Sequence, residues 1–135
     1  FAEALHEELE RLDVLVPRGE LPADERAAGD RYVATMTYAC RALVGTGHAI
    51  GIAPPGAPMI PCPPYRHVHV VSCPTEADAR TLIEPIARSL VAVGSDDADA
   101  ARRLAPPWAR RSALGRMQRP PLDGPVDLRG RVTGA

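Results

Sequence analysis

Two stretches in the first half of the chain repeat apolar residues at helical spacing. In Ala2–Val16, apolar side chains recur every three or four positions among acidic ones, and a proline follows directly. This spacing predicts an amphipathic surface helix with one buried stripe. A second apolar stripe runs from Ala28 to Leu43, with Pro22 near its start and Gly45 beyond its end. We therefore expect a second helix that continues to this glycine.

The remainder of the chain alternates strand patterns with helical ones. Residues 48–60 predict one or two short strands broken by prolines, and Arg66–Val71 has the β-branched alternation typical of a strand. Thr75 is suited to cap a helix over 75–90, which Pro85 is expected to kink or split. Beyond it we expect a buried strand at 90–93, a helix capped by Ser95 that extends to Leu104, and a strand at 111–114. This order predicts an α/β fold with a mostly parallel sheet and flanking helices.

Charge and composition exclude several classes of protein. Over 135 residues the formal net charge is −1, so the basic surface that binds nucleic acid is not expected. The sequence has no apolar run of about 18 residues, so no membrane span is expected either. Its three cysteines, at positions 40, 62 and 73, are an odd number, and no secretory signal precedes them. This usage favours a reducing cytoplasm over a disulfide framework.

Cysteine and histidine residues offer two candidate sites. Cys73 precedes the cap of the helix expected over 75–90, where the helix dipole favours a thiolate, so it is the best placed of the three cysteines, although the pattern favours an ordinary structural cysteine over a nucleophile. His67 and His69 point to one face of their strand, and Cys62 and Cys73 flank them. Zinc takes such ligands, but the spacing matches no standard zinc finger. The alternative is two ordinary strand histidines, one side of which faces solvent.

The most unusual segment is Leu114–Asp123, which reads LGRMQRPPLD. It follows the last expected strand, so Arg116, Gln118 and Arg119 would lie beyond the carboxyl end of that strand, where open α/β sheets bind ligands. The alternative is a terminal segment that its two prolines pin against the body of the protein. The glycine pair at 45–47 lacks a third glycine and a preceding strand, so it does not predict a nucleotide site.

The segment LGRMQRPPLD resembles the C-terminal motif of bacterial fatty acyl-CoA reductases of the LuxC type, a branch of the aldehyde dehydrogenase superfamily. The family residues present in and just after this segment are Gly115, Arg116, Met117, Gln118, Pro120, Pro121, Leu122, Asp123, Pro125 and Asp127. The chain departs from the family at Gly124, Val126 and Leu128, where family members have tryptophan, histidine and glycine. A less specific similarity extends over residues 1–9, 21–38, 65–71 and 82–94.

The resemblance implies an NADPH-dependent reductase that converts a fatty acyl thioester, of CoA or a carrier protein, to an aldehyde through a cysteine acyl-enzyme. Residues 1–125 would be the C-terminal part of an aldehyde-dehydrogenase-like catalytic domain, and 126–135 a poorly ordered tail. The family's nucleophile precedes the helix that Phe1 begins, so we expect no catalytic residue in this chain and no activity from it alone. The residues expected near substrate or cofactor are Gly115, Arg116, Met117 and Gln118. The full-length enzyme would be a cytoplasmic homo-oligomer.

Two other classes of function stay open at this point. One is a non-catalytic metal-binding module built from Cys62, His67, His69 and Cys73. The other is an α/β interaction domain that is complete in itself.

Overall fold

The computed structural model describes residues 1–117 and 119, so the tail expected over 126–135 lies outside the described residues. The chain divides into two compact units, Phe1–Cys73 (unit 1) and the part from Pro74 onward (unit 2). Each unit combines helices with a small sheet, which confirms the α/β class. The aldehyde-dehydrogenase-like architecture over 1–125 stays a prediction.

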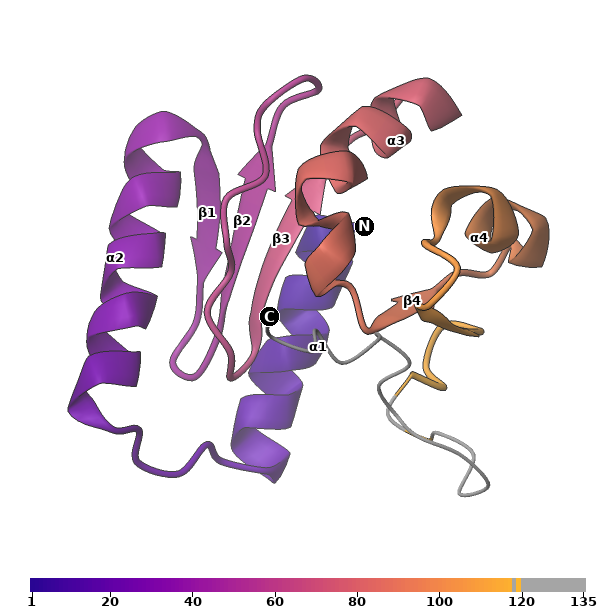
Figure 1. The fold of residues 1–135 in the computed structure, drawn as a ribbon. Coiled ribbons are helices and arrows are strands. Elements are labelled where there is room, and N and C mark those ends of the chain that lie inside the picture. Colours follow the sequence, from indigo (N-terminus) through magenta and orange to yellow (C-terminus); the bar gives the residue numbers. More distant parts are fainter. Residues whose placement is uncertain (118, 120–135) are drawn as a thin grey trace, which may run out of the picture. The chain divides into compact units, whose positions relative to one another are not determined.

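Unit 1 is a three-stranded sheet with helices on both faces (Figure 1). Its sheet has the order β1-β2-β3, with β1 antiparallel to β2 and β2 parallel to β3. Its elements are α1 (Ala2–Leu15), α2 (Ala23–Ala39), β1 (Arg41–Val44), β2 (Ala49–Ala53) and β3 (His67–Val71). The helix expected over 2–16 and the strand expected over 66–71 are therefore confirmed, each within a residue.

The alternation of side chains along β2 assigns one helix to each face of this sheet. A side chain at Gly51 would point at Tyr32 and Met36, so this face of β2 packs against α2. Met36 is fully buried there, in a core with Tyr32 and Ala53. His48, on the other face, contacts α1.

The second helix is shorter than its apolar stripe predicted, because β1 occupies part of the expected range. We expected helix up to Gly45, but α2 ends at Ala39 and Arg41–Val44 forms a strand. Leu43 pairs with Ile50 across the antiparallel β1–β2 ladder. Pairing with β2 stabilises the extended form, and such tertiary pairing overrides local helix preference.

Unit 2 is built around a parallel pair of short strands. Its elements are α3 (Glu76–Ile83), the 3-10 helix η1 (Glu84–Ser89), β4 (Ala92–Gly94), α4 (Ala98–Leu104) and β5 (Arg110–Ser112). The predicted split at Pro85 is confirmed, since the α-helix gives way to η1 one residue before the proline. The expectation that β3, β4 and β5 share one sheet is wrong, because β3 pairs with β2 while β4 and β5 form a separate sheet.

The N-terminal cap of α4 also differs from the expected one. Asp97, not Ser95, caps this helix, and its carboxylate accepts hydrogen bonds from the backbone N–H groups of Asp99 and Ala100 at 2.9 and 3.0 Å. Ser95 lies two residues before the cap, and its hydroxyl accepts a hydrogen bond from the backbone N–H of Asp97. A carboxylate at this position interacts more favourably with the helix dipole than a hydroxyl does.

Replacing Thr75 by alanine is expected to lower the free energy of unfolding of unit 2 by about 1 kcal/mol. Thr75 and Asp78 form a reciprocal capping box at the start of α3, in which each side chain accepts from the other residue's backbone N–H. Urea unfolding followed by the fluorescence of Trp108 measures the loss. The matched control is Thr81→Ala on the same helix, where the hydroxyl only donates to the carbonyl of Ala77. An equal effect of both substitutions would contradict the capping role.

Candidate functional site

Residues 113–117 form a turn beyond the carboxyl ends of β4 and β5. Gly115 has a φ of +73°, a left-handed conformation that favours glycine, and the N–H of Arg116 donates to the carbonyl of Ala113. Met117 folds back over β4, since a Cβ at Gly94 would lie 2.9 Å from the Met117 Cγ. Of the four residues expected near substrate or cofactor, Gly115 and Met117 therefore shape this turn. Arg116 is exposed on it, and Gln118 lies outside the described residues.

An arginine of β5 anchors the turn and retains unused hydrogen-bond donors. Arg110 donates from Nη2 to the carbonyl of Met117 at 2.6 Å. Its Nε and Nη1 atoms are buried and have no hydrogen-bond partner among the described residues. Buried guanidinium donors are rarely left unpaired, so these two atoms are the unsatisfied donors of this turn.

A cavity of about 410 Å³ lies at the same end of the strand pair. Ser95 and Ser112 line it at the two strand ends, and the N–H of Ser95 donates to the carbonyl of Ser112 at 3.0 Å. Arg102 and Arg111 also line it. Arg102 pairs with Asp99, whereas Arg111 is exposed. The cavity thus combines hydroxyl and guanidinium donors at the edge where parallel sheets bind ligands.

Both histidines expected in the zinc alternative are held by other contacts. His67 donates from Nδ1 to the carbonyl of Pro64 at 2.8 Å, and Nδ1 of His69 lies 3.0 Å from the hydroxyl of Tyr32. Within residues 1–117 and 119, no three His, Cys, Asp or Glu side chains are grouped so that they could hold a metal ion. The structure therefore does not assemble Cys62, His67, His69 and Cys73 into the site that their spacing allowed.

The three cysteines are free and half-buried. Cys40 and Cys62 pack against the core of unit 1, which confirms the packing interpretation for Cys40. Burial raises the pKa of the Cys62 thiol, although a hydrogen bond with Tyr32 acts in the opposite direction. Cys62 is therefore a poor nucleophile.

The most tightly connected polar group in unit 1 joins α1 to the sheet and was missed by sequence reasoning. His48 is fully buried, and its Nδ1 lies 2.8 Å from the Asp13 carboxylate. Because a carboxylate only accepts hydrogen bonds, this nitrogen carries a hydrogen. The other nitrogen of the ring, Nε2, lies 2.8 Å from Nδ1 of His6, and Nε2 of His6 lies 3.6 Å from Oε1 of Glu10. The four side chains form a continuous polar chain from the interior to the surface of α1.

Asp13 is the centre of this network. Its side chain is only 10 % exposed, and its two oxygens accept from the Gly47 N–H at 2.9 Å, from His48, and from Arg66 at 2.7 Å. Burial by itself would raise the pKa of the Asp13 carboxyl, but these hydrogen bonds outweigh it and lower the pKa to about 2. Asp13 is therefore ionised at all physiological pH values. Tyr65 and Arg66 both have positive φ, and Arg66 also donates from Nη2 to the carbonyl of Val16, at the end of α1, at 2.7 Å.

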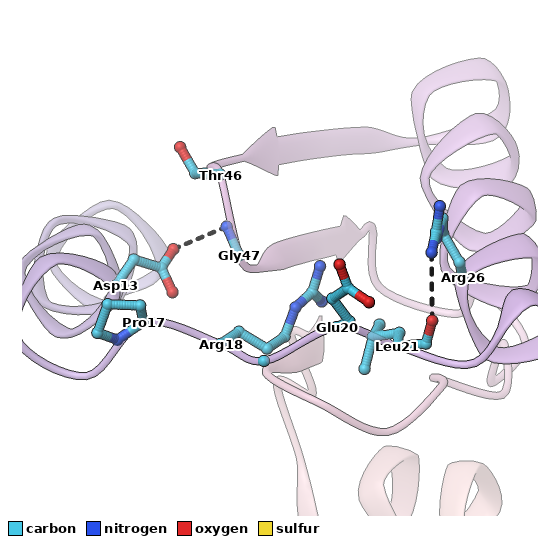
Figure 2. A pocket seen from close by; sticks show the side chains of 9 residues that line it. Asp13, Pro17, Arg18, Glu20, Leu21, Arg26, Thr46 and Gly47 are labelled. Carbon is cyan, nitrogen blue, oxygen red and sulfur yellow. Dashed lines mark hydrogen bonds between the residues drawn. The ribbon is translucent and has the colours of Figure 1, made fainter.

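A cavity of about 400 Å³ lies beside Asp13, between the link that joins α1 to α2 and the turn that joins β1 to β2. Figure 2 shows Asp13 on one side and Arg26 on the other, with Arg18 and Glu20 projecting from the link toward the centre. Thr46, at the tip of the β1–β2 turn, completes the polar lining.

No local sequence signal marks this second site. Asp13 lies in a helix whose other acidic residues face solvent. Its partner His48 is 35 residues away in the sequence, so the contact exists only in the folded chain. Only the folded structure explains the glycine pair at 45–47. A Cβ at Gly45 would overlap the His48 ring, and one at Gly47 would lie 2.9 Å from the Asp13 Cγ.

Comparisons with protein-family models, with curated proteins and with solved structures find no match to this chain. Among the helices that the structure describes, none has the length and apolar character needed to cross a bilayer.

Proposed function

We propose that this chain is the C-terminal part of an NADPH-dependent reductase that converts a fatty acyl thioester to an aldehyde. The observation that carries the proposal is the motif Leu114–Asp123, which resembles that of LuxC-type fatty acyl-CoA reductases. The part of the motif that is described follows β5 directly, beyond the carboxyl ends of a parallel strand pair. Ligands of α/β proteins bind at such edges.

The charges at this edge support an anionic substrate or cofactor. Both NADPH and an acyl-CoA carry phosphates, and arginine is the side chain that best matches phosphate geometry. Arg110 has two buried donor atoms without a partner among the described residues, and Arg111 and Arg116 are exposed nearby in sequence. NADPH would supply the hydride that reduces the acyl group. The residues of this chain would bind and orient the phosphates.

The nucleophile of the proposed reaction is not one of the three cysteines described above. The resemblance places it before the helix that Phe1 begins, so the proposal requires a cysteine in the coding sequence directly upstream. A thiolate there would attack the thioester carbonyl, release the carrier thiol and leave an acyl-enzyme for hydride transfer. This chain alone is expected to reduce no substrate.

The complete natural protein is expected to oxidise NADPH when it is given long-chain acyl-CoA, and Arg116→Gln is expected to lower kcat/KM about tenfold. That factor corresponds to the loss of one charge-assisted hydrogen bond to a phosphate. Initial rates measured by the absorbance of NADPH, together with detection of the aldehyde, give both quantities. Arg80→Gln, on an exposed face of α3, is the matched control and should retain full activity. The absence of acyl-CoA-dependent NADPH oxidation over all chain lengths would refute the proposal.

A further inference from the structure

We propose that unit 1 carries a separate binding site for a small phosphorylated molecule, in the cavity beside Asp13. The cavity lies between the α1–α2 link and the β1–β2 turn and has a volume of about 400 Å³, within the range typical of small-molecule sites. All the residues that line it belong to unit 1. The inference goes beyond the proposed reductase activity and does not depend on it.

Two guanidinium groups at the cavity have no carboxylate partner among the described residues. The hydrogen bonds of Arg18 and Arg26 are long ones to backbone carbonyls, 3.5 Å to Tyr65 and 3.3 Å to Leu21. By contrast, Arg11, Arg41 and other arginines of the chain form ion pairs with glutamate or aspartate. The positive charge of Arg18 and Arg26 is therefore available to an anion, and guanidinium groups bind phosphate through paired hydrogen bonds.

The acidic residues at the cavity do not cancel this charge. The Asp13 carboxylate is paired with Arg66 and accepts hydrogen bonds from three donors, so it acts as a fixed part of the wall. With Asp13 paired to Arg66, Glu20 is the remaining carboxylate of the lining, and it faces the two guanidinium groups of Arg18 and Arg26. Glu20 can accept a hydrogen bond from a hydroxyl group of the ligand. The ligand that fits is therefore a phosphate ester with free hydroxyl groups, such as a sugar phosphate.

The walls of the cavity are held in place before any ligand binds. Asp13 fixes the β1–β2 turn through the Gly47 N–H, as the dashed line in Figure 2 shows. Thr46, which follows Gly45 in that turn, brings a hydroxyl with no hydrogen-bond partner among the described residues. The 17-residue helix α2 begins at the cavity after Pro22 without a side-chain cap, so its first backbone N–H groups remain as donors, beside the acidic Asp24 and Glu25 of its first turn. Preorganised donors of this kind reduce the entropy lost on binding.

The test is calorimetric titration of the chain with ribose 5-phosphate, inorganic phosphate and ribose. We expect saturable binding of ribose 5-phosphate with a Kd below about 1 mM, weaker binding of inorganic phosphate and no binding of ribose. Arg18→Gln and Arg26→Gln should each weaken binding about tenfold. Arg31→Gln is the matched control, because Arg31 lies on the same helix as Arg26 but outside this cavity.

Three results would overturn the proposal. They are the absence of saturable binding at about 10 mM ligand, equal affinities of ribose and ribose 5-phosphate, and affinities that neither Arg18→Gln nor Arg26→Gln alters. Methyl NMR signals of Met36 and Ile50, both fully buried in unit 1, report whether each variant is folded. None of these measurements involves NADPH or a thioester, so their outcome is separate from that of the reductase assay.

Discussion

Replacing Asp13 by asparagine is expected to lower the free energy of unfolding of unit 1 by about 3 kcal/mol. The substitution keeps the shape of the side chain but removes the charge that pairs with Arg66 and holds the His48 ring. Arg66 then stays in a largely buried position without a counter-charge, and this accounts for most of the loss. Urea unfolding at pH 7, followed by the methyl NMR signals of Met36 and Ile50, measures the change in unit 1 alone.

The matched control is Asp24→Asn. Asp24 is exposed in the first turn of α2, where its charge interacts with the helix dipole and with the nearby Tyr65 side chain. Its loss is therefore expected to lower the free energy of unfolding by no more than about 0.5 kcal/mol. Similar effects of the two substitutions would contradict a special role for the network around Asp13.

The stability of the Asp13→Asn variant is also expected to depend on pH differently from that of the wild-type chain. The pKa of the Asp13 carboxyl is about 2 in the folded chain and 3.8 in its ordinary state, so protonation favours unfolding. The stabilisation is therefore complete above about pH 4 and is lost as the pH falls toward 2. The difference in stability between the wild-type chain and Asp13→Asn should narrow over this interval. A difference that stays constant from neutral pH down to the lower limit would show that the charge of Asp13 does not stabilise the fold.

Replacing Gly51 by valine is expected to destabilise unit 1 by about 3 kcal/mol. Gly51 lies in the middle of β2 and faces α2, and a Cβ there would lie 2.7 and 2.8 Å from the Cγ and Cε of Met36. It would also overlap the hydroxyl of Tyr32. Met36 is fully buried, so it has no free space to move into. The higher strand propensity of valine offsets less than about 1 kcal/mol of this loss.

Gly19→Ala provides the control for the glycine substitution. Gly19 lies in the α1–α2 link, where an added Cβ meets nothing within 4 Å. The change in the free energy of unfolding is expected to stay within about 0.5 kcal/mol. The Gly51→Val variant is measured with the same methyl signals as above. An unchanged or increased stability would mean that the contact between α2 and β2 is less tight than the structure shows.

The candidate site at the end of β5 was partly predictable, because its signal is local. Leu114–Asp123 stands out by composition, and its position after a strand follows from the order of elements. What Gly115 and Met117 do there was not predictable. One provides a left-handed φ and the other packs over Gly94, and both roles depend on neighbours that only the folded chain supplies.

The site in unit 1 was not predictable at all, because its residues meet only through tertiary structure. Asp13, His48 and Arg66 come from a helix, a turn and the approach to a strand. The periodicity of apolar residues predicted that Asp13 lies on a helix, but it does not predict which side chains form hydrogen bonds with Asp13. Spacing likewise singled out His67 and His69 as one pair, whereas the histidine that forms the buried network is His48.

The sequence by itself determined the elements whose signals lie within a few residues. These are the amphipathic helix α1, the Thr75 cap, the split at Pro85 and the α/β class. Each depends on side-chain periodicity, capping chemistry or the missing N–H of proline, all of which act locally. The tertiary structure decided the strand at 41–44, the partners of β3 and β4, and the network around Asp13. Strand pairing and buried ion pairs join residues far apart in the chain, so their free energy appears only when the fold brings those residues together.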